Sequence, residues 1–111
     1  MKTSELTGAQ LDWAVAQCEG KRPSLFIFQQ TGKLAPEHNY STNWAQGGPI
    51  IEREHINTCS GYQWEASKDF DAIGGDSDTA VEYGPTTLIA AMRCYVASNL
   101  GDEIEIPEEL K

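Results

Sequence analysis

Residues 84–101 read GPTTLIAAMRCYVASNLG and contain a single charged side chain, Arg93. Pro85 is tolerated in the first turn of a helix and Gly101 is a typical helix end, so the stretch predicts a helix over residues 85–99. Its apolar residues cover almost every side, as in helices that are buried on most sides. We expect this helix to lie at the centre of the fold, packed on a sheet and against another helix or a second subunit.

A second helix is expected near the N-terminus. Thr7 and Gln10 form a capping-box pattern, and apolar residues recur at helical spacing between residues 11 and 18. Gly20 is a natural C-terminal stop, so the pattern predicts a helix over residues 8–19.

The remaining segments indicate strands and loops. Aromatic and β-branched residues, or alternation of apolar and polar residues, predict strands over residues 24–29, 62–66, 80–83 and 103–106. Residues 30–48 are expected to form a long loop, residues 68–79 a mobile acidic loop, and residues 50–56 either a short helix or a strand. The order of elements predicts an α+β fold in one domain, residues 1–111, with a small, mainly antiparallel sheet packed with two helices.

Composition limits the function classes. The chain has 111 residues, 40% of them hydrophobic, and a net charge of −9. Phosphate neutralisation requires clustered Lys and Arg, so this charge argues against binding of DNA, RNA or anionic membranes. No apolar run reaches membrane-spanning length and the first residues do not resemble a signal peptide, so we expect a cytosolic protein. Three widely spaced cysteines are expected to be reduced.

The segment YSTNWAQGGPIIER, residues 40–53, is the best candidate for a binding site. Trp44 stands in a polar stretch and can stack on a base, and Gly47-Gly48 would expose backbone N–H groups to a ligand. The start of the helix predicted over residues 85–99, at Thr86-Thr87, is a ready anion site, although simple helix capping is the alternative. The expected ligand-binding residues are Tyr40, Asn43, Trp44, Gln46, Gly47, Gly48, Thr86, Thr87 and Arg93.

Arg93 has two interpretations. A buried guanidinium must be paired, either with a carboxylate such as Glu52 or Glu5, or with a phosphate or carboxylate of a ligand. The sequence leaves both open.

Patterns for catalysis and metal binding are incomplete. Gly47-Gly48-Pro49 lacks the end of a Walker loop, and there is no Gly-x-Ser-x-Gly elbow. His55 and Cys59 are four residues apart but lack two further zinc ligands, and the Asp pairs at 69–71 and 76–78 are fragments of a calcium pattern. We therefore expect no enzyme, no catalytic residue, no metal and no cofactor.

Two long motifs carry a family resemblance. Residues 40–54, YSTNWAQGGPIIERE, and residues 84–110, GPTTLIAAMRCYVASNLGDEIEIPEEL, resemble the NinX-like family of small phage proteins, a domain of unknown function. The resemblance implies an accessory protein that acts in the cytosol of the host bacterium.

Three functions are weighed. The first is a non-enzymatic binder that sequesters a small anionic, nucleotide-like signalling molecule and so opposes host defence. The second is an acidic protein-interaction module that inhibits a host protein, and the third, with least support, is an enzyme acting on a nucleotide. A homo-oligomer is expected, because a short chain has little material to bury an all-round apolar helix.

Overall fold

The computed structural model describes residues 1–71 and 77–111. Within them, three antiparallel strands, β1 (Asn57–Cys59), β2 (Trp64–Asp71) and β3 (Ser77–Gly84), form one sheet in that order. The α-helices are α1 (Gly8–Cys18), α2 (Leu25–Thr31), α3 (Trp44–Arg53) and α4 (Thr87–Leu100). The expected α+β class with an antiparallel sheet is confirmed. Among the described residues, no helix combines the length and hydrophobicity needed to span a bilayer.

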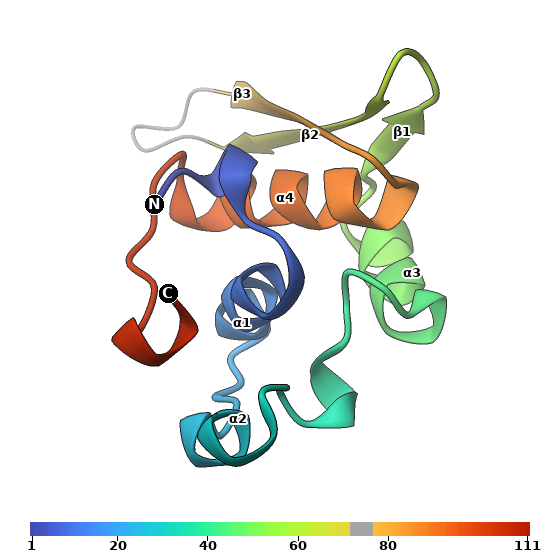
Figure 1. Ribbon diagram of the computed structural model, residues 1–111. Helices are drawn as coiled ribbons and strands as arrows, with labels where there is room; N and C mark the ends of the chain where they lie inside the picture. The colour runs from blue at the N-terminus through green and yellow to red at the C-terminus, as the bar shows by residue number, and fades with distance from the viewer. Residues whose placement is uncertain (72–76) are drawn as a thin grey trace.

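Helix α4 is the central element (Figure 1). The sheet packs on one side of it and α1 on the other, α3 lies beside its N-terminal end, and α2 lies farthest from the sheet. Residues 90–97 of α4 are all buried, which confirms the predicted burial of this helix. The chain's own elements provide the cover. Burial of α4 therefore no longer requires a second subunit, and the homo-oligomer remains a prediction without this support.

The register of the β2–β3 hairpin decides which residues face α4. Trp64 pairs with Gly84 at one end and Asp71 with Ser77 at the other. Along β3, Ala80 and Gly84 are buried, whereas Val81 and Tyr83 are exposed on the outer face. The even-numbered residues of β3 therefore face the helix, as the two-residue period of a strand requires.

Residues 24–29, predicted as a strand, are instead the start of α2. The Ser24 hydroxyl caps the helix by accepting the N–H of Ile27 at 3.2 Å, and Gly32, with φ of 75°, ends it. Local capping at both ends outweighs the strand preference of aromatic and β-branched residues, which is weak and depends on context.

Two predicted loops are shorter than expected. The loop over residues 30–48 ends at Asn43, because α3 begins at Trp44 and continues through the ambiguous residues 50–53. In the acidic loop, residues 68–71 belong to β2 and residues 77–79 to β3, because each extends the antiparallel pairing. Residues 72–76 of that loop lie outside the described residues.

The predicted edge strand over residues 103–106 is wrong. Glu103 forms an isolated antiparallel bridge with Lys2, outside the three-stranded sheet. Ile106 and Leu110 are buried in the core, and the Leu110 carbonyl accepts a hydrogen bond from the Gln10 side chain of α1 at 3.0 Å. The alternation of residues 103–106 therefore reflects burial of one side of an extended segment, whose backbone pairing is limited to a short contact with residues 1–3.

A polar network links the C-terminal ends of α1 and α3 to the middle of α4. The Arg53 guanidinium at the end of α3 donates to both carboxylate oxygens of Glu19, at 3.1 and 2.6 Å, just beyond α1. Arg53 also donates to Glu54 at 2.8 Å, and the Tyr95 hydroxyl of α4 donates to Glu19. The hydrogen bonds from Arg53 lower the pKa of Glu19, and burial raises the pKa of Tyr95. The network fixes α3 relative to α1 and α4.

Candidate functional site

A pocket of about 400 Å³ lies where the N-terminal ends of α3 and α4 meet. Trp44 is the first residue of α3, Trp64 begins β2, and Thr86 is the N-cap of α4. The pocket therefore combines two indole rings with the start of a helix, where backbone N–H groups have no intrahelical acceptor. Its lining residues are Ser41, Thr42, Trp44, Trp64, Pro85, Thr86, Thr87, Leu88 and Ile89.

Gly47 allows α3 to approach α4 closely. A methyl group at Gly47 would lie 2.5 Å from the carbonyl oxygen of Tyr40 and 2.6 Å from Cδ2 of Leu88, so no side chain fits. Gly84 has a related role, because a methyl group there would lie 2.9 Å from the backbone nitrogen of Ala90. These two close approaches bring the helix ends together at the pocket.

The role predicted for Gly47 and Gly48 needs correction. Both residues lie inside α3, and the N–H of Gly47 donates to the carbonyl oxygen of Asn43 at 2.9 Å. Interior helical N–H groups bond to carbonyls four residues earlier and so do not face a ligand. The expectation that this pair forms an N–H cradle is therefore wrong, because the expected loop is a helix. A methyl group at Gly48 would make only an ordinary contact with the Trp44 ring, at 3.5 Å, so this position does not require a glycine.

Three predicted site residues hold the chain before α3 and do not line the pocket. Asn43 caps α3 by accepting the N–H of Ala45 at 2.9 Å. The Gln46 side chain accepts the N–H of Asn39 at 2.7 Å and donates to the Pro36 carbonyl oxygen at 2.8 Å. Tyr40 is buried, with its hydroxyl 3.1 Å from Nδ1 of His38. These contacts position Trp44 at the pocket.

Thr86 and Thr87 both line the pocket. The Thr86 hydroxyl accepts the N–H of Ile89 at 3.1 Å, so the capping function weighed for this residue is present. Thr87 is the first residue of α4, and its N–H and that of Leu88 belong to the turn that has no intrahelical acceptor. The structure therefore brings Trp44, Thr86 and Thr87 to one place, as the binding hypothesis requires.

Arg93 does not line this pocket, and its partners differ from both carboxylates considered. Its Nε donates to the carbonyl oxygen of Leu6 at 2.9 Å and its Nη1 to that of Tyr83 at 2.7 Å. The expected ion pair with Glu52 or Glu5 is wrong, because backbone carbonyls of the N-terminal segment and β3 lie closer to this buried guanidinium. Burial lowers the pKa of Arg93, and the nearby Glu82 raises it. Arg93 thus ties the N-terminal segment, α4 and β3 together.

Asp12 of α1 is a supporting residue that sequence reasoning missed. Its buried carboxylate accepts the N–H of Ser41 at 2.8 Å, which fixes one wall of the pocket. Burial raises the pKa of Asp12, whereas the hydrogen bond from the Ser41 N–H lowers it. The sequence could have indicated this role, because Asp12 is the one acidic residue of α1 and lies next to Leu11 on its apolar side.

Trp64 was also missed as a site residue. It pairs with Gly84, directly before Pro85 and Thr86, and this register alone carries its half-buried ring to the pocket. The sequence indicates the strand but not its partner residue.

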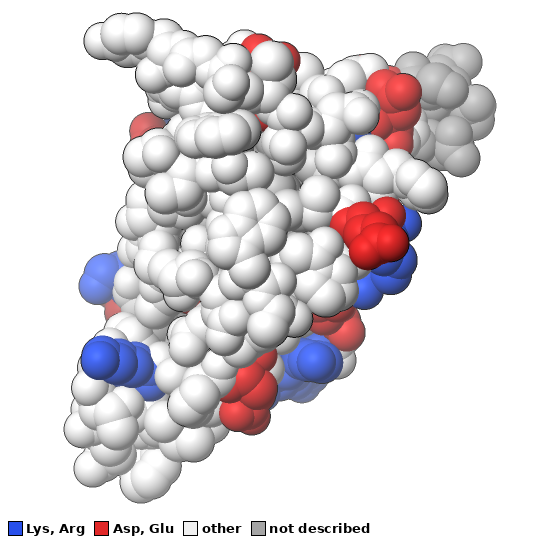
Figure 2. All heavy atoms as spheres, turned by 90° about the vertical axis from the view of Figure 1, so that its right-hand side faces the viewer, with Lys and Arg blue, Asp and Glu red and all other residues white. Residues whose placement is uncertain are grey.

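The face that carries α3 has few charges over its broad middle (Figure 2). Asp, Glu, Lys and Arg lie mainly at the margins of this view. Trp44 is 57% exposed, and Tyr62, in the turn before β2, is fully exposed. The chain has a net charge of −9, yet this face has few charges, and α3, which begins with the exposed Trp44, lies on it.

Comparison with known proteins gives one informative match. A family model described as "Bacteriophage P22, NinX" matches residues 2–99, a range that contains every residue lining the pocket. No curated protein matches the chain.

Proposed function

Because the chain belongs to the bacteriophage P22 NinX family, we propose that it is a phage accessory protein that binds a small nucleotide-like molecule without transforming it. One observation carries this proposal: Trp44, Trp64 and the N-terminal end of α4 line a single pocket. Stacking rings and a helix N-terminus are the two elements that a base and its phosphate need.

The dimensions and chemistry of the pocket support such a ligand. Its volume of about 400 Å³ lies within the range of roughly 300–1,000 Å³ found for small-molecule sites. An exposed indole such as Trp44 can stack on a base, which contributes about 1–3 kcal/mol in single-stranded nucleic-acid binders. The first turn of α4 offers N–H groups and the positive end of the helix dipole to a phosphate.

Charge favours this pocket over the other surfaces of an acidic protein. All nine residues that line it are uncharged, so an anion meets no carboxylate there. The larger groove beside β3 carries Asp78, Glu82 and Asp102 and is unsuited to an anion. The protein's overall charge of −9 weakens long-range attraction of polyanions, in line with a small ligand rather than DNA or RNA.

Binding without catalysis is favoured by the state of the nucleophilic side chains. Burial raises the pKa of the Cys18 and Cys94 thiols to about 12, so both are protonated at neutral pH. His38 is buried against Tyr40 and lies outside the pocket lining. A protein of this kind can act stoichiometrically, by sequestering a signalling nucleotide in the bacterial cytosol and so countering host defence.

Thermal melting in the presence of nucleotides tests the proposal. Mono-, di- and cyclic nucleotides are added separately while unfolding is followed by circular dichroism, and tryptophan fluorescence is titrated in parallel. A ligand that binds the native state raises the melting midpoint, because at a free concentration one hundred times its Kd it adds about 2.7 kcal/mol to the free energy of unfolding. We expect one nucleotide class to raise the midpoint and quench fluorescence, and chromatography to recover it unchanged. If millimolar nucleotides of every class leave both readings unchanged, the proposal fails.

A protein-interaction module is the second candidate, and the face that carries α3 favours it, because it has few charges (Figure 2). Interface cores are enriched in Trp and Tyr and depleted in charges, and besides Trp44 the exposed Tyr62 and Tyr83 together line a smaller hollow. The interaction would then use this face rather than the acidic surface. Tyr62→Ala separates the two functions, because it should weaken capture of a host protein and leave nucleotide binding intact.

A further inference from the structure

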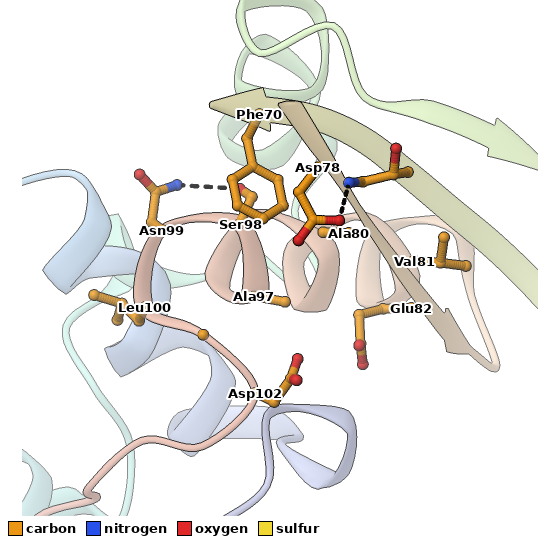
Figure 3. A pocket seen from close by; sticks show the side chains of 12 residues that line it. Phe70, Asp78, Ala80, Val81, Glu82, Ala97, Ser98, Asn99, Leu100 and Asp102 are labelled. Carbon is orange, nitrogen blue, oxygen red and sulfur yellow. Dashed lines mark hydrogen bonds between the residues drawn. The ribbon is translucent and has the colours of Figure 1, made fainter. Parts of the chain in front are cut away.

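A groove of about 900 Å³ lies between β3 and the C-terminal end of α4, away from the Trp44 pocket. Residues 78–82 of β3 form one wall, residues 97–102 form the other, and Phe70 of β2 closes one end (Figure 3). The groove therefore runs along a strand rather than into the core.

The free edge of β3 borders this groove. The sheet order places β2 on one side of β3, and no strand in the described part of the chain lies on the other. The Tyr83 carbonyl oxygen accepts from Arg93, and the Thr79 N–H donates to the Asp78 carboxylate at 2.8 Å. The backbone N–H and C=O groups of residues 79 and 83 therefore point away from β2, toward the free edge. Val81 has the same parity and is exposed, so its N–H and C=O lie at the free edge.

The groove is acidic. Asp78 and Glu82 project from the α4-facing side of β3, and in Figure 3 Glu82 and Asp102 point toward each other across the groove. Burial and the nearby Asp102 raise the pKa of Glu82, as unbalanced negative charge does. The C-terminal end of α4 adds the negative end of its dipole.

We propose that an extended basic segment of a partner protein binds along this groove as an added strand of the sheet. Its backbone would pair with the N–H and C=O of Val81, as in other cases of strand addition to an open edge. Its alternate side chains, Lys or Arg, would enter the groove and meet Asp78, Glu82 and Asp102. This site is separate from the nucleotide pocket and does not depend on it.

Charge complementarity selects this occupant over a second copy of the chain. Strand addition between two copies would place the Asp78 and Glu82 carboxylates of both in one groove, and like charges opposite each other destabilise a sheet. Each copy also carries a net charge of −9. A basic partner instead neutralises the groove.

The test uses the full chain and a synthetic peptide with acetylated N-terminus in which Lys and Val alternate over eight residues. At low salt, titration should shift the backbone amide signals of Thr79 and Val81 and slow hydrogen exchange of the Val81 N–H. Asp78→Asn combined with Glu82→Gln should weaken binding about tenfold. Glu105→Gln, which removes an exposed acid outside the groove, should leave binding unchanged.

Backbone pairing is tested separately from charge. Val81→Pro removes the outward N–H, and proline is tolerated on edge strands, so this variant should fold and lose binding. If it does not fold, the test uses the wild-type protein and a peptide with N-methyl groups on alternate residues. This peptide lacks the N–H groups needed for strand pairing and should not bind. The proposal would be overturned if the N-methylated peptide bound as tightly as the unmodified peptide. It would also be overturned if spermidine, at the same concentration of positive charge, fully displaced the peptide, because the groove would then be a non-specific cation surface. A dimer in solution that Val81→Pro dissociates would make a second copy the occupant and also overturn it.

Discussion

Trp44, the first residue of α3, and Thr86, the N-cap of α4, line the same pocket although the entire β-sheet lies between them in the sequence. Their meeting depends on the close approach of α3 to α4 at Gly47 and on the Trp64–Gly84 pair at the end of the hairpin. Binding and stability can therefore be changed independently, since Trp44 is largely exposed whereas the residues that position it are buried.

Trp44→Ala should abolish nucleotide binding and leave the melting temperature nearly unchanged. The indole is 57% exposed, so its removal takes little buried area from the core, whereas loss of stacking removes about 1–3 kcal/mol of binding free energy. Fluorescence titration and thermal melting measure the two effects. Tyr62→Ala is the matched control, because Tyr62 is exposed and lies outside the pocket. Loss of folding in Trp44→Ala would mean that the indole is a core residue.

Gly47→Ala should destabilise the protein, whereas Gly48→Ala should not. The new methyl group at residue 47 would meet the Tyr40 carbonyl oxygen at 2.5 Å, and such overpacking costs typically about 1–3 kcal/mol. At residue 48 the nearest contact is 3.5 Å, and replacing glycine inside a helix can stabilise by up to about 1 kcal/mol. Urea unfolding of both variants measures the difference. Equal effects would show that α3 does not approach α4 as described.

Glu19→Gln should reduce stability at neutral pH and flatten its dependence on pH. Hydrogen bonds from Arg53 lower the pKa of Glu19 from its ordinary value of 4.5. A carboxylate whose pKa is lower in the folded state stabilises the protein above the unfolded value, and this stability is lost as pH falls through the folded value. Urea midpoints of the two proteins should therefore differ most at neutral pH and approach each other as the pH falls below 4.5, through the lowered pKa of Glu19. A constant difference across this range would contradict the assignment, and Glu105→Gln serves as the exposed control.

Arg93→Leu should destabilise the protein because two backbone carbonyls lose their donors. The Leu6 and Tyr83 oxygens accept from Arg93 at 2.9 and 2.7 Å, and an unsatisfied buried acceptor costs about 1–3 kcal/mol. Arg93→Lys should cost less, since one ammonium can reach one of the two carbonyls. Denaturant unfolding measures both variants. A variant that keeps wild-type stability and loses only ligand binding would return Arg93 to the binding site.

Much of the fold could be predicted from sequence because it rests on local rules. Helical periodicity identifies α1 and α4, and the apolar composition of residues 88–97 identifies α4 as buried. The capping box predicted at Thr7 and Gln10 is wrong, because the Thr7 side chain makes no capping hydrogen bond and Gln10 instead donates to the Leu110 carbonyl oxygen. The same local rules fail for α2, where Ser24 and Gly32 cap a helix made of residues that prefer strands. They also fail after Gly101, where an alternating segment pairs only briefly with residues 1–3 and does not join the sheet.

The candidate site was predicted in part. Trp44, Thr86 and Thr87 line the pocket, and Gly47 allows α3 to approach α4 closely. The other predicted residues make structural contacts instead, namely Tyr40, Asn43, Gln46 and Arg93. A polar or glycine-rich segment has the same composition whether it contacts a ligand or satisfies its own backbone. Composition therefore cannot separate these roles.

By itself, the sequence determined the α+β class, the two long helices, the presence of only one charged residue in α4 and membership of the phage family through its long motifs. Only the tertiary structure decided that Trp64 and Trp44 line the same pocket and that Arg93 donates hydrogen bonds to backbone carbonyls. It also decided that the free edge of β3 borders an acidic groove. The physical reason is the range of the interactions. Caps and periodicity act within a few residues, whereas strand register, helix approach and the pairing of buried charges join residues that are far apart along the chain.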